Sequence, residues 1–474
     1  VTNTGGLGDI TCKTYDELNQ LSSTTVDYGP FNKTISYTYD ASGNRKTMTD
    51  PDGGITTYEY DQVNRLLSIT DPSSNVTTYE YDNAGRRTKL TNQNSVNTTY
   101  TYDAANRLLN LTNTKSNEDV ISSYSYQYDN VGNKLNMTEV DGNITCYEYD
   151  AMDRLINVAY PDGSTTQYTY DGVGNRLTQV VDGVPTSYIY DADNRLLSAG
   201  TTNYSYDNNG NLVTKTNASN TTTYQYDYEN RLTKVTLPDT TQVTYQYSLF
   251  WNRLSKTITN GTTYYLYDFE DILMELNETG AQKARYTHGP RIDEPISMIR
   301  KGNISYYHFD GLNSVTSLTD TNENVIVTYQ YDAFGVIASE TGVVENPYRF
   351  ISREYEKEIG LYFHRARYYD PFVGRYITPD PIKELDEVNF YTYVENNPLA
   401  FHDPYGTGLK GAGSFVAEYG LKVGSVYLAC LCAPSFSKYM QCVKECLDAE
   451  GITVGSALKD LAKGVVLGEI AGIG

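Results

Sequence analysis

Long apolar runs, tryptophan and histidine are all scarce in this chain of 474 residues. It has 1 Trp and 4 His, and its hydrophobic content is only 39%. No apolar run has the length needed to cross a bilayer, which excludes a membrane-spanning helix. The histidines, His288, His308, His364 and His402, are scattered, and we expect each to serve ordinary packing or turn formation. We predict neither a metal site nor a cofactor.

Positive charge is also in short supply. The chain has 37 Lys and Arg against 59 Asp and Glu, which gives a net charge of −22 and a pI of about 4.6. A surface that binds nucleic acid needs the opposite sign, so we expect no nucleic acid on the outer surface. The chain begins at Val1 rather than at Met, so we expect an upstream segment that would carry any signal peptide.

Tyrosine is the abundant aromatic residue, with 47 Tyr against 12 Phe. Tyr and Thr fit the pleated, half-exposed surface of a β-sheet, and the many Asn, Asp, Ser and Gly residues fit turns. Low hydrophobicity is also a mark of disorder. The aromatic residues are evenly spaced, however, and this favours many short strands.

A Tyr-x-Tyr-Asp motif recurs, and most steps between successive Asp residues are 21 residues long. Copies end at Asp40, Asp61, Asp82, Asp103, Asp129, Asp150 and Asp171, drifting later to Asp191, Asp207, Asp227, Asp268, Asp310 and Asp332. The two Tyr of a copy lie on one face of a strand, and the Asp begins a turn. A second strand and a Pro-Asp-Gly type turn follow, so one period predicts one β-hairpin.

A single hairpin is marginal in water, so stability must come from stacking of the copies. We expect Tyr to lie beside Tyr on neighbouring strands, each pair contributing roughly 0.2–1 kcal/mol. Bulky Tyr on one face and short polar groups on the other would make the sheet curl. The predicted fold is therefore mainly β, a spiralling antiparallel β-hairpin shell or barrel with a small α-helical C-terminal region.

These repeats resemble those of the YD-repeat family, which includes Rhs proteins, the C subunits of bacterial Tc toxins and teneurins. The resemblance covers roughly residues 30–406 and implies strands wound into a hollow shell. We predict a lead-in at 1–30, the YD-repeat shell at 31–340, a core segment at 341–406 and a passenger at 407–474. The resemblance implies that the shell encloses its own C-terminal passenger, with an upstream segment or a partner subunit completing the wall.

The most specific motif is the core segment, which contains Tyr348–Tyr355, Gly360–Pro371 and Gly374–Pro381 and ends in Asp403-Pro-Tyr-Gly406. It resembles the Rhs repeat-associated core. In that family the segment caps the shell and acts as an aspartyl protease in cis, releasing the passenger just beyond Asp-Pro-x-Gly.

The resemblance assigns Asp380 and Asp403 as the catalytic aspartates and Arg367 as an associated arginine. Two carboxylates held close together can share a proton, so that one serves as base and the other as acid. Lys383 and Thr407 depart from the family pattern, which has Gly and Leu there. The alternative is that these Asp-Pro pairs only form turns and caps.

The composition changes after Gly406 to Gly- and Ala-rich stretches with helical spacing, at 411–429 and 454–470. Between them lie Cys430, Cys432, Cys442 and Cys446, for which two disulfides, free buried thiols and a zinc site are all open. This tail has no His, Arg or Trp, which argues against a nuclease or deaminase. An amphipathic pair that contacts a membrane and a helical plug both remain open.

Twelve N-x-S/T sequons, which chance explains in so Asn- and Thr-rich a chain, also fit a secreted, glycosylated shell. They are Asn32, Asn75, Asn97, Asn110, Asn136, Asn143, Asn203, Asn217, Asn220, Asn260, Asn277 and Asn303. We therefore expect a secreted or cell-surface protein and weigh two functions. One is a toxin-like delivery shell that releases its passenger, and the other is a non-catalytic adhesion or structural protein.

Overall fold

The computed structural model describes residues 2–4, 10–248, 252–382, 388–408 and 410–411. These residues form strands and tight turns with two short 3-10 helices, which confirms the mainly β prediction. The chain divides into two units, Val1–Gly408 and Leu409–Gly474, and strand β39 (Lys410–Gly411) belongs to the second. The predicted helical tail with Cys430, Cys432, Cys442 and Cys446 lies outside the described residues, as does Lys383. In the described ranges, no helix has the length and apolar character needed to cross a membrane.

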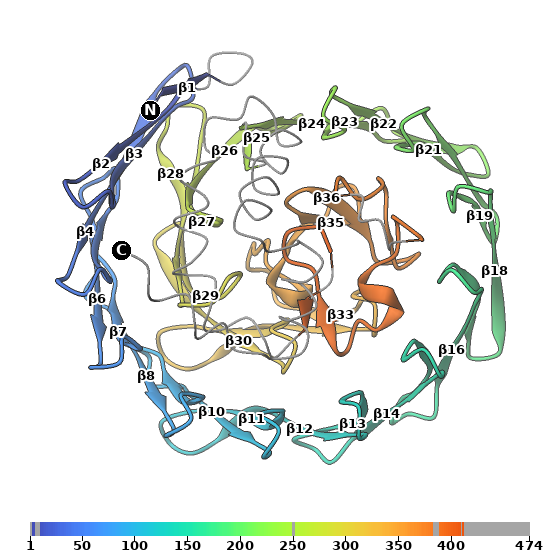
Figure 1. Cartoon of the computed structure of the whole chain (residues 1–474), viewed down its shortest axis with the longest axis horizontal. Coiled ribbons are helices and arrows are strands. Elements are labelled where there is room, and N and C mark those ends of the chain that lie inside the picture. Colours follow the sequence, from blue (N-terminus) through green and yellow to red (C-terminus); the bar gives the residue numbers. More distant parts are fainter. Residues whose placement is uncertain (1, 5–9, 249–251, 383–387, 409, 412–474) are drawn as a thin grey trace, which may run out of the picture. The chain divides into compact units, whose positions relative to one another are not determined.

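The wall of the first unit is one sheet of 33 strands, in which each strand is antiparallel to the strand before it (Figure 1). Its first part consists of β1 (Thr2–Thr4), β2 (Ile10–Tyr15), β3 (Leu21–Asp27), β4 (Asn32–Tyr39), β5 (Arg45–Thr49), β6 (Ile55–Tyr60), β7 (Leu66–Thr70), β8 (Val76–Tyr81), β9 (Arg87–Thr91), β10 (Asn97–Tyr102), β11 (Leu108–Thr114), β12 (Val120–Tyr128), β13 (Lys134–Glu139), β14 (Ile144–Tyr149), β15 (Leu155–Ala159) and β16 (Thr165–Tyr170). It continues with β17 (Arg176–Val181), β18 (Val184–Tyr190), β19 (Leu196–Ala199), β20 (Thr202–Tyr206), β21 (Leu212–Asn217), β22 (Asn220–Tyr226), β23 (Leu232–Thr236), β24 (Gln242–Tyr247), β25 (Arg253–Ile258), β26 (Gly261–Asp268), β27 (Asp271–Leu276), β28 (Gln282–His288), β29 (Pro295–Arg300), β30 (Asn303–Phe309), β31 (Val315–Thr319), β32 (Val325–Tyr331) and β33 (Ile337–Thr341). The hairpin architecture thus already includes β2 and β3, within the lead-in predicted for residues 1–30.

The Asp of each motif organises the turn of its hairpin. Asp61 Oδ1 accepts hydrogen bonds from the amides of Val63 and Arg65, both 2.9 Å long. Arg65 Nε donates to Asp61 Oδ2 at 2.7 Å, and Arg65 Nη1 reaches the backbone oxygen of Asp82 in the next repeat at 3.1 Å. Asn64, the third turn residue, has a φ of 62°, a conformation that Asn and Gly tolerate. The Asp and Arg of the motif therefore close one turn and tie it to the next.

The two Tyr of each motif have different surroundings. Tyr58 is buried and faces Ile69 on the adjacent strand, whereas the register shifts by a β-bulge at Tyr60. The Tyr60 hydroxyl donates to the backbone oxygen of Arg45, in the preceding repeat. The predicted pairing of Tyr beside Tyr on neighbouring strands is wrong, because aliphatic residues such as Ile69 lie opposite the first Tyr.

The hydrogen bond from the second Tyr hydroxyl to a backbone oxygen recurs along the wall and connects each repeat to the preceding one. The same bond joins Tyr39 to Leu21, Tyr81 to Leu66, Tyr102 to Arg87, Tyr128 to Leu108, Tyr149 to Lys134, Tyr170 to Leu155, Tyr190 to Arg176, Tyr226 to Leu212, Tyr247 to Leu232 and Tyr331 to Val315. Each of these hydrogen bonds contributes about 1 kcal/mol net to stability. Because each bond joins two repeats, this stability belongs to the array rather than to a single repeat.

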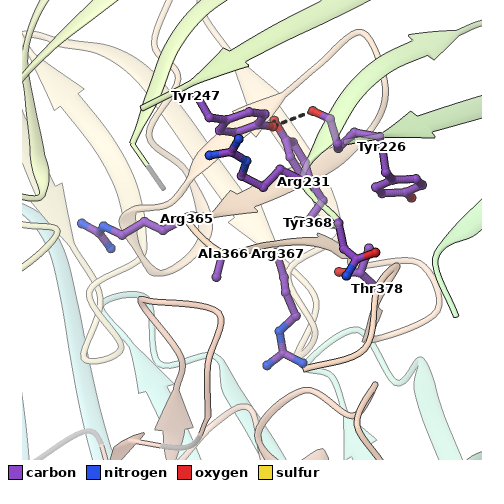
Figure 2. Close-up of a pocket in the computed structure, with 10 residues that line it drawn as sticks. Tyr226, Arg231, Tyr247, Arg365, Ala366, Arg367, Tyr368 and Thr378 are labelled. Atoms are coloured by element: carbon purple, nitrogen blue, oxygen red, sulfur yellow. Dashed lines mark hydrogen bonds between the residues drawn. The ribbon is translucent and has the colours of Figure 1, made fainter. Parts of the chain in front are cut away.

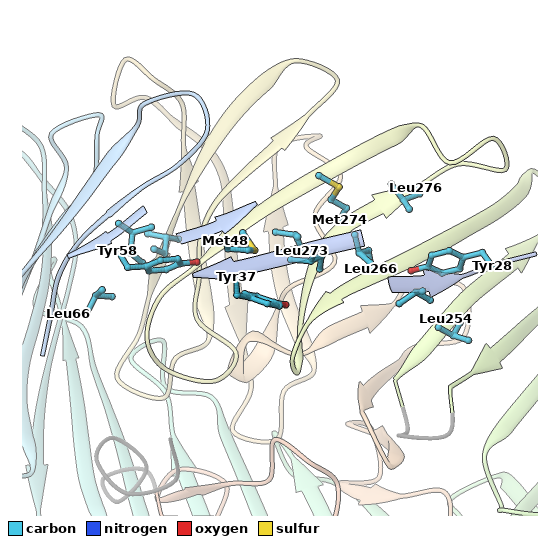
Figure 3. Packing of buried hydrophobic residues seen from close by; sticks show 14 of the residues in the cluster. Tyr28, Tyr37, Met48, Tyr58, Leu66, Leu254, Leu266, Leu273, Met274 and Leu276 are labelled. Carbon is cyan, nitrogen blue, oxygen red and sulfur yellow. The ribbon is translucent and has the colours of Figure 1, made fainter. Parts of the chain in front are cut away.

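The wall winds past its own beginning, so that β25–β32 lie beside β3–β12 (Figure 1). Figure 3 shows the start of this seam, where Tyr28 and Met48 pack among Leu266, Leu273 and Leu276. Hydrogen bonds cross the same seam, including that from the Tyr28 hydroxyl to the backbone oxygen of Tyr265, at 2.7 Å. The predicted spiral is thus held by side chains rather than by pairing between strands of different turns.

The core segment follows the wall with little regular structure of its own. It contains η1 (Phe350–Ser352), β34 (Glu354–Glu356), β35 (Leu361–His364), β36 (Arg367–Asp370), β37 (Arg375–Tyr376), η2 (Val394–Asn396) and β38 (Phe401–His402).

Core residues 389–397 bind the Asp-turns of the wall. Asn389 donates to Asn175, Tyr391 to the backbone oxygen of Gly210, and Asn397 to Asn133. A row of repeat turns is therefore covered by the core segment.

Candidate active site

The structure brings together the three site residues predicted in the core segment. Arg367 Nη2 lies 2.7 Å from Asp380 Oδ2 and 3.2 Å from Asp403 Oδ2. All three side chains are buried, at 3%, 1% and 2% exposure respectively. Because one guanidinium nitrogen contacts both aspartates, the two carboxylates lie within two hydrogen-bond lengths of each other. They are bridged by the arginine, an arrangement that the expectation of two carboxylates sharing a proton did not include.

Asp403 accepts four hydrogen bonds, all of a kind that an ionised carboxylate accepts. Its Oδ1 receives the amide of Thr407, and its Oδ2 receives the amide of Gly408, both at 3.1 Å. Oδ2 also receives Arg367 Nη2 and the hydroxyl of Tyr376, the latter at 2.8 Å. The carboxylate is thus fixed against the backbone that directly follows Gly406.

Three consecutive residues of the core bind three consecutive carbonyl groups of the Asp-Pro-Tyr-Gly segment. Arg365 Nη1 donates to the oxygen of Pro404 at 2.6 Å, and the amide of Ala366 donates to the oxygen of Tyr405 at 3.1 Å. Arg367 Nε donates to the oxygen of Gly406 at 2.6 Å. We call Arg365–Arg367 the carbonyl clamp.

Gly406 is required by the closeness of this clamp. Its φ is +67°, and a Cβ at this position would meet the backbone oxygen of His364. The Gly of the Asp-Pro-x-Gly motif is therefore explained by both its backbone conformation and the approach of β35.

The wall supports the clamp through a buried acid. Asp293, in the loop between β28 and β29, accepts hydrogen bonds from Arg365 at 2.7 Å and from the guanidinium of Arg353. Arg353 in turn donates to the backbone oxygen of Phe363. Burial raises the pKa of Asp293, but the charges of Arg353 and Arg365 outweigh it and hold that pKa below its usual value. The position of Arg365 thus depends on the inner turn of the wall.

Two further residues of the site, Tyr376 and His364, lie within the core motif but were not predicted as site residues. The Tyr376 hydroxyl contacts Asp403, and the Arg367 guanidinium lies 3.6 Å from the centre of the Tyr376 ring. His364 Nδ1 lies 3.0 Å from the same hydroxyl. We expected His364 to serve ordinary packing or turn formation, and its ring also contacts the hydroxyl of Tyr376 at the site.

A small cavity lies beside the clamp, between β23, β24 and the core (Figure 2). Figure 2 shows Arg365 and Arg367 on either side of Ala366, with their side chains pointing in different directions, and Tyr247 above them. The Tyr247 hydroxyl donates to the backbone oxygen of Leu232. The carbonyl clamp therefore borders the wall directly.

The predicted glycosylation sequons differ in their accessibility. Asn75 is buried and its Nδ2 donates to Asp71 at 2.7 Å, so we expect no glycan on this asparagine in the folded wall. Four sequon asparagines are partly buried: Asn97, Asn110, Asn136 and Asn277. Seven are exposed: Asn32, Asn143, Asn203, Asn217, Asn220, Asn260 and Asn303. Glycosylation of the exposed asparagines stays a prediction.

Two family models match the chain. The Teneurin YD-shell model matches residues 133–399, and the RHS Repeat model matches residues 15–55, 39–73 and 60–96. The matched ranges include most of the wall, apart from its beginning and residues 97–132, and most of the core segment.

Curated relatives include the tRNA nuclease WapA of Bacillus subtilis, 31% identical over 260 residues, which covers 52% of this chain and 11% of WapA. The toxin protein Tse5 of Pseudomonas aeruginosa is 30% identical over 125 residues, covering 26% of this chain and 10% of Tse5. The chain thus spans about a tenth of the length of each of these relatives.

Among solved structures, the Tc holotoxin pore of Photorhabdus luminescens matches with a TM-score of 0.73 at 20% identity, covering 86% of this chain and 24% of that one. The complex of TcdB2 and TccC3 with TEV matches with a TM-score of 0.70 at 20% identity, covering 84% and 24%. At this identity the likeness concerns the fold, a wall of wound β-hairpins.

Proposed function

The chain belongs to the teneurin YD-shell family, and from that premise we propose that it is the shell of a toxin-like Rhs protein that encloses a C-terminal passenger and releases it by cleaving itself. One observation carries the release step: Arg367 contacts Asp380, Asp403 and the carbonyl oxygen of Gly406, and Asp403 binds the next two amides, those of Thr407 and Gly408. The passenger is the segment that follows this point, predicted at 407–474.

The contacts suggest a role for each group of the site. Asp403, with its four donors, is the base that takes a proton from the attacking water, and Asp380 gives a proton to the departing amide nitrogen. The water oxygen bonds to the carbonyl carbon as the peptide C–N bond breaks, so that an acid and an amine result. Arg367 binds both carboxylates and the Gly406 oxygen, and it serves to hold the reacting groups in register.

A denaturing gel and mass spectrometry of the purified full chain test the proposal. We expect a fragment that begins within Thr407–Leu409, absent in the Asp380→Asn and Asp403→Asn variants. Asp332→Asn is the matched control, since Asp332 is a buried turn aspartate of the wall, bonded to nearby amides, and should leave cleavage intact. A wild-type chain that stays whole, or variants that are cleaved as fast as the wild type, would refute the release step.

The position of the new terminus matters, because a fragment that begins at Pro404 would indicate chemical hydrolysis of an Asp-Pro bond. Catalysis by the site is supported only if the fragment begins downstream of Gly406 and is absent from both the Asp380→Asn and the Asp403→Asn variants.

A second function, a secreted structural or adhesion protein, draws support from the exposed sequons such as Asn143 and Asn303 on the wall. It predicts a single intact band and a glycosylated wall. Enzymatic removal of glycans from protein secreted by a eukaryotic host, followed by mass measurement, tests it.

A further inference from the structure

We propose that His364 and Tyr376 form a hydrogen-bonded relay that orients Asp403 for the self-cleavage reaction. The inference rests on the proposed function and adds two positioning residues to it. The relay runs from His364 Nδ1 to the Tyr376 hydroxyl, at 3.0 Å, and from that hydroxyl to Asp403 Oδ2, at 2.8 Å. All of its members are 2% exposed or less.

The direction of the hydrogen bonds follows from the acceptor at the end of the relay. An ionised carboxylate only accepts, so the Tyr376 hydroxyl donates its proton to Asp403. The hydroxyl oxygen then has lone pairs left for His364, and Nδ1 must carry the hydrogen that it donates. The geometry therefore assigns a hydrogen to Nδ1 of His364, as in the neutral form protonated at that nitrogen.

The surroundings of His364 favour this neutral form. The ring packs against the rings of Tyr369, Tyr376 and Tyr393, with centroid distances of 5.4–5.7 Å. Burial lowers the pKa of His364 well below its usual value, and the charges of Arg353, Arg367 and Arg365 act in the same direction, while the backbone oxygen of Asp403 opposes them. A lowered pKa favours the singly protonated ring, which donates from Nδ1 alone.

Tyr376 contacts the site in two separable ways. Its ring packs against the Arg367 guanidinium, and its hydroxyl contacts Asp403. Tyr376→Phe removes the hydroxyl and keeps the ring, so packing against Arg367 is preserved. A role in packing alone would leave cleavage unchanged in this variant, and a relay would not.

Cleavage of newly made full chain in a cell-free translation, followed by pulse–chase, measures the effect. We expect Tyr376→Phe to slow cleavage by roughly ten- to a hundredfold, the effect of losing a hydrogen bond to a charged group. His364→Leu should slow it similarly. His364→Asn should restore most of the rate, because the Asn amide can donate from nearly the position of Nδ1.

Comparison of these variants with Asp380→Asn separates the two hypotheses. If Asp380→Asn abolishes cleavage while Tyr376→Phe and His364→Leu cleave at the wild-type rate, the relay is wrong and the proposed function stands. If the wild type itself stays whole, the self-cleavage role of both the site and the relay is overturned.

A second measurement does not depend on cleavage. Histidine labelled with 15N in the uncleaved Asp380→Asn chain reports the tautomer of His364 by NMR, with His364→Asn identifying its signals. We expect a neutral ring protonated at Nδ1, whose signal shifts when Tyr376→Phe is added. A ring protonated at Nε2, or a signal indifferent to Tyr376, would overturn the relay.

Discussion

The seam between the two turns of the wall contains a buried ion pair whose removal should be costly. Arg87 on β9 and Glu294 at the end of the β28–β29 loop bond through two nitrogens and two oxygens, with Nη2 to Oε2 at 3.2 Å. Their side chains are 3% and 4% exposed. Glu294→Gln keeps the shape but leaves Arg87 as a buried charge without its counterion. Breaking a buried pair from one side costs about 3–5 kcal/mol.

The first unit extends to Gly408, and a unit of this size has a large entropy of unfolding. If it unfolds as one, the loss of about 3–5 kcal/mol should lower the midpoint of thermal unfolding by about 5 °C. Differential scanning calorimetry at pH 7 measures it. Glu80→Gln is the matched control, because Glu80 faces Lys89 on the same strand pair at 3.9 Å, with side chains 66% and 36% exposed. An exposed pair of this kind contributes at most about 1 kcal/mol, so the control should barely move the midpoint.

The difference between wild type and Glu294→Gln should also depend on pH. Burial raises the pKa of Glu294, but the charge and hydrogen bonds of Arg87 outweigh it and the net pKa lies below its usual value. A carboxyl whose folded-state pKa is depressed stabilises the fold above the unfolded-state pKa, about 4.3, and loses that contribution as the pH falls. The two midpoints should therefore converge in acid. Equal midpoints at pH 7, or a difference that grows in acid, would refute this account of the seam.

Three further outcomes follow from the wall and the site. Tyr81→Phe removes a hydroxyl that donates to the preceding repeat and should lower the free energy of unfolding by about 0.5–1.5 kcal/mol, whereas Tyr228→Phe, at an exposed ring, should change nothing in urea titrations. Gly406→Ala places a methyl group against a backbone oxygen and should abolish self-cleavage on a gel, while Gly85→Ala, a turn glycine with open space around its Cα, should leave it intact. Burial raises the pKa of Asp332 to about 6, so the folded state binds its proton more tightly than the unfolded chain, and stability should fall as the pH rises from about 4 to 6. Asp332→Asn should remove that fall, which urea titrations across this range would detect.

The repeat pattern predicted the hairpins because its signals are local. The Asp and the Asn, Arg or Gly that follow it act within five residues, and they form the predicted turns, as at Asp61 and Asn64. The Tyr pairing failed because the motif does not specify the residue on the neighbouring strand, which is Ile69 opposite Tyr58. Both Tyr pack against the same buried cluster, as a period of two predicts, and the Tyr60 hydroxyl reaches the carbonyl of Arg45.

The pitch of the spiral could not be predicted from the repeat, since every copy is compatible with the same local curvature. The bond between Tyr28 and Tyr265 joins residues 237 positions apart, and nothing in the motif at either end specifies the partner. Opposite charges, as on Arg87 and Glu294, identify such contact partners only once it is known which strands of the two turns of the spiral lie side by side.

The site shows the same division between local motif and spatial partner. Arg367, Asp380 and Asp403 were found because the family resemblance assigns them a role. His364 and Tyr376 lie in the same segment but, like Asp293, act through contacts that only the fold creates. The proposed self-cleavage gives a physical reason for the many contacts. It would occur once on the chain itself, with no product to release for another turnover, so rigid binding of the segment at 404–408 carries no penalty. Every carbonyl from Pro404 to Gly406 is bound by the clamp, and the next two amides are bound by Asp403. Such a site can hold the segment at 404–408 in one geometry as soon as the chain has folded, because the segment needs to react only once.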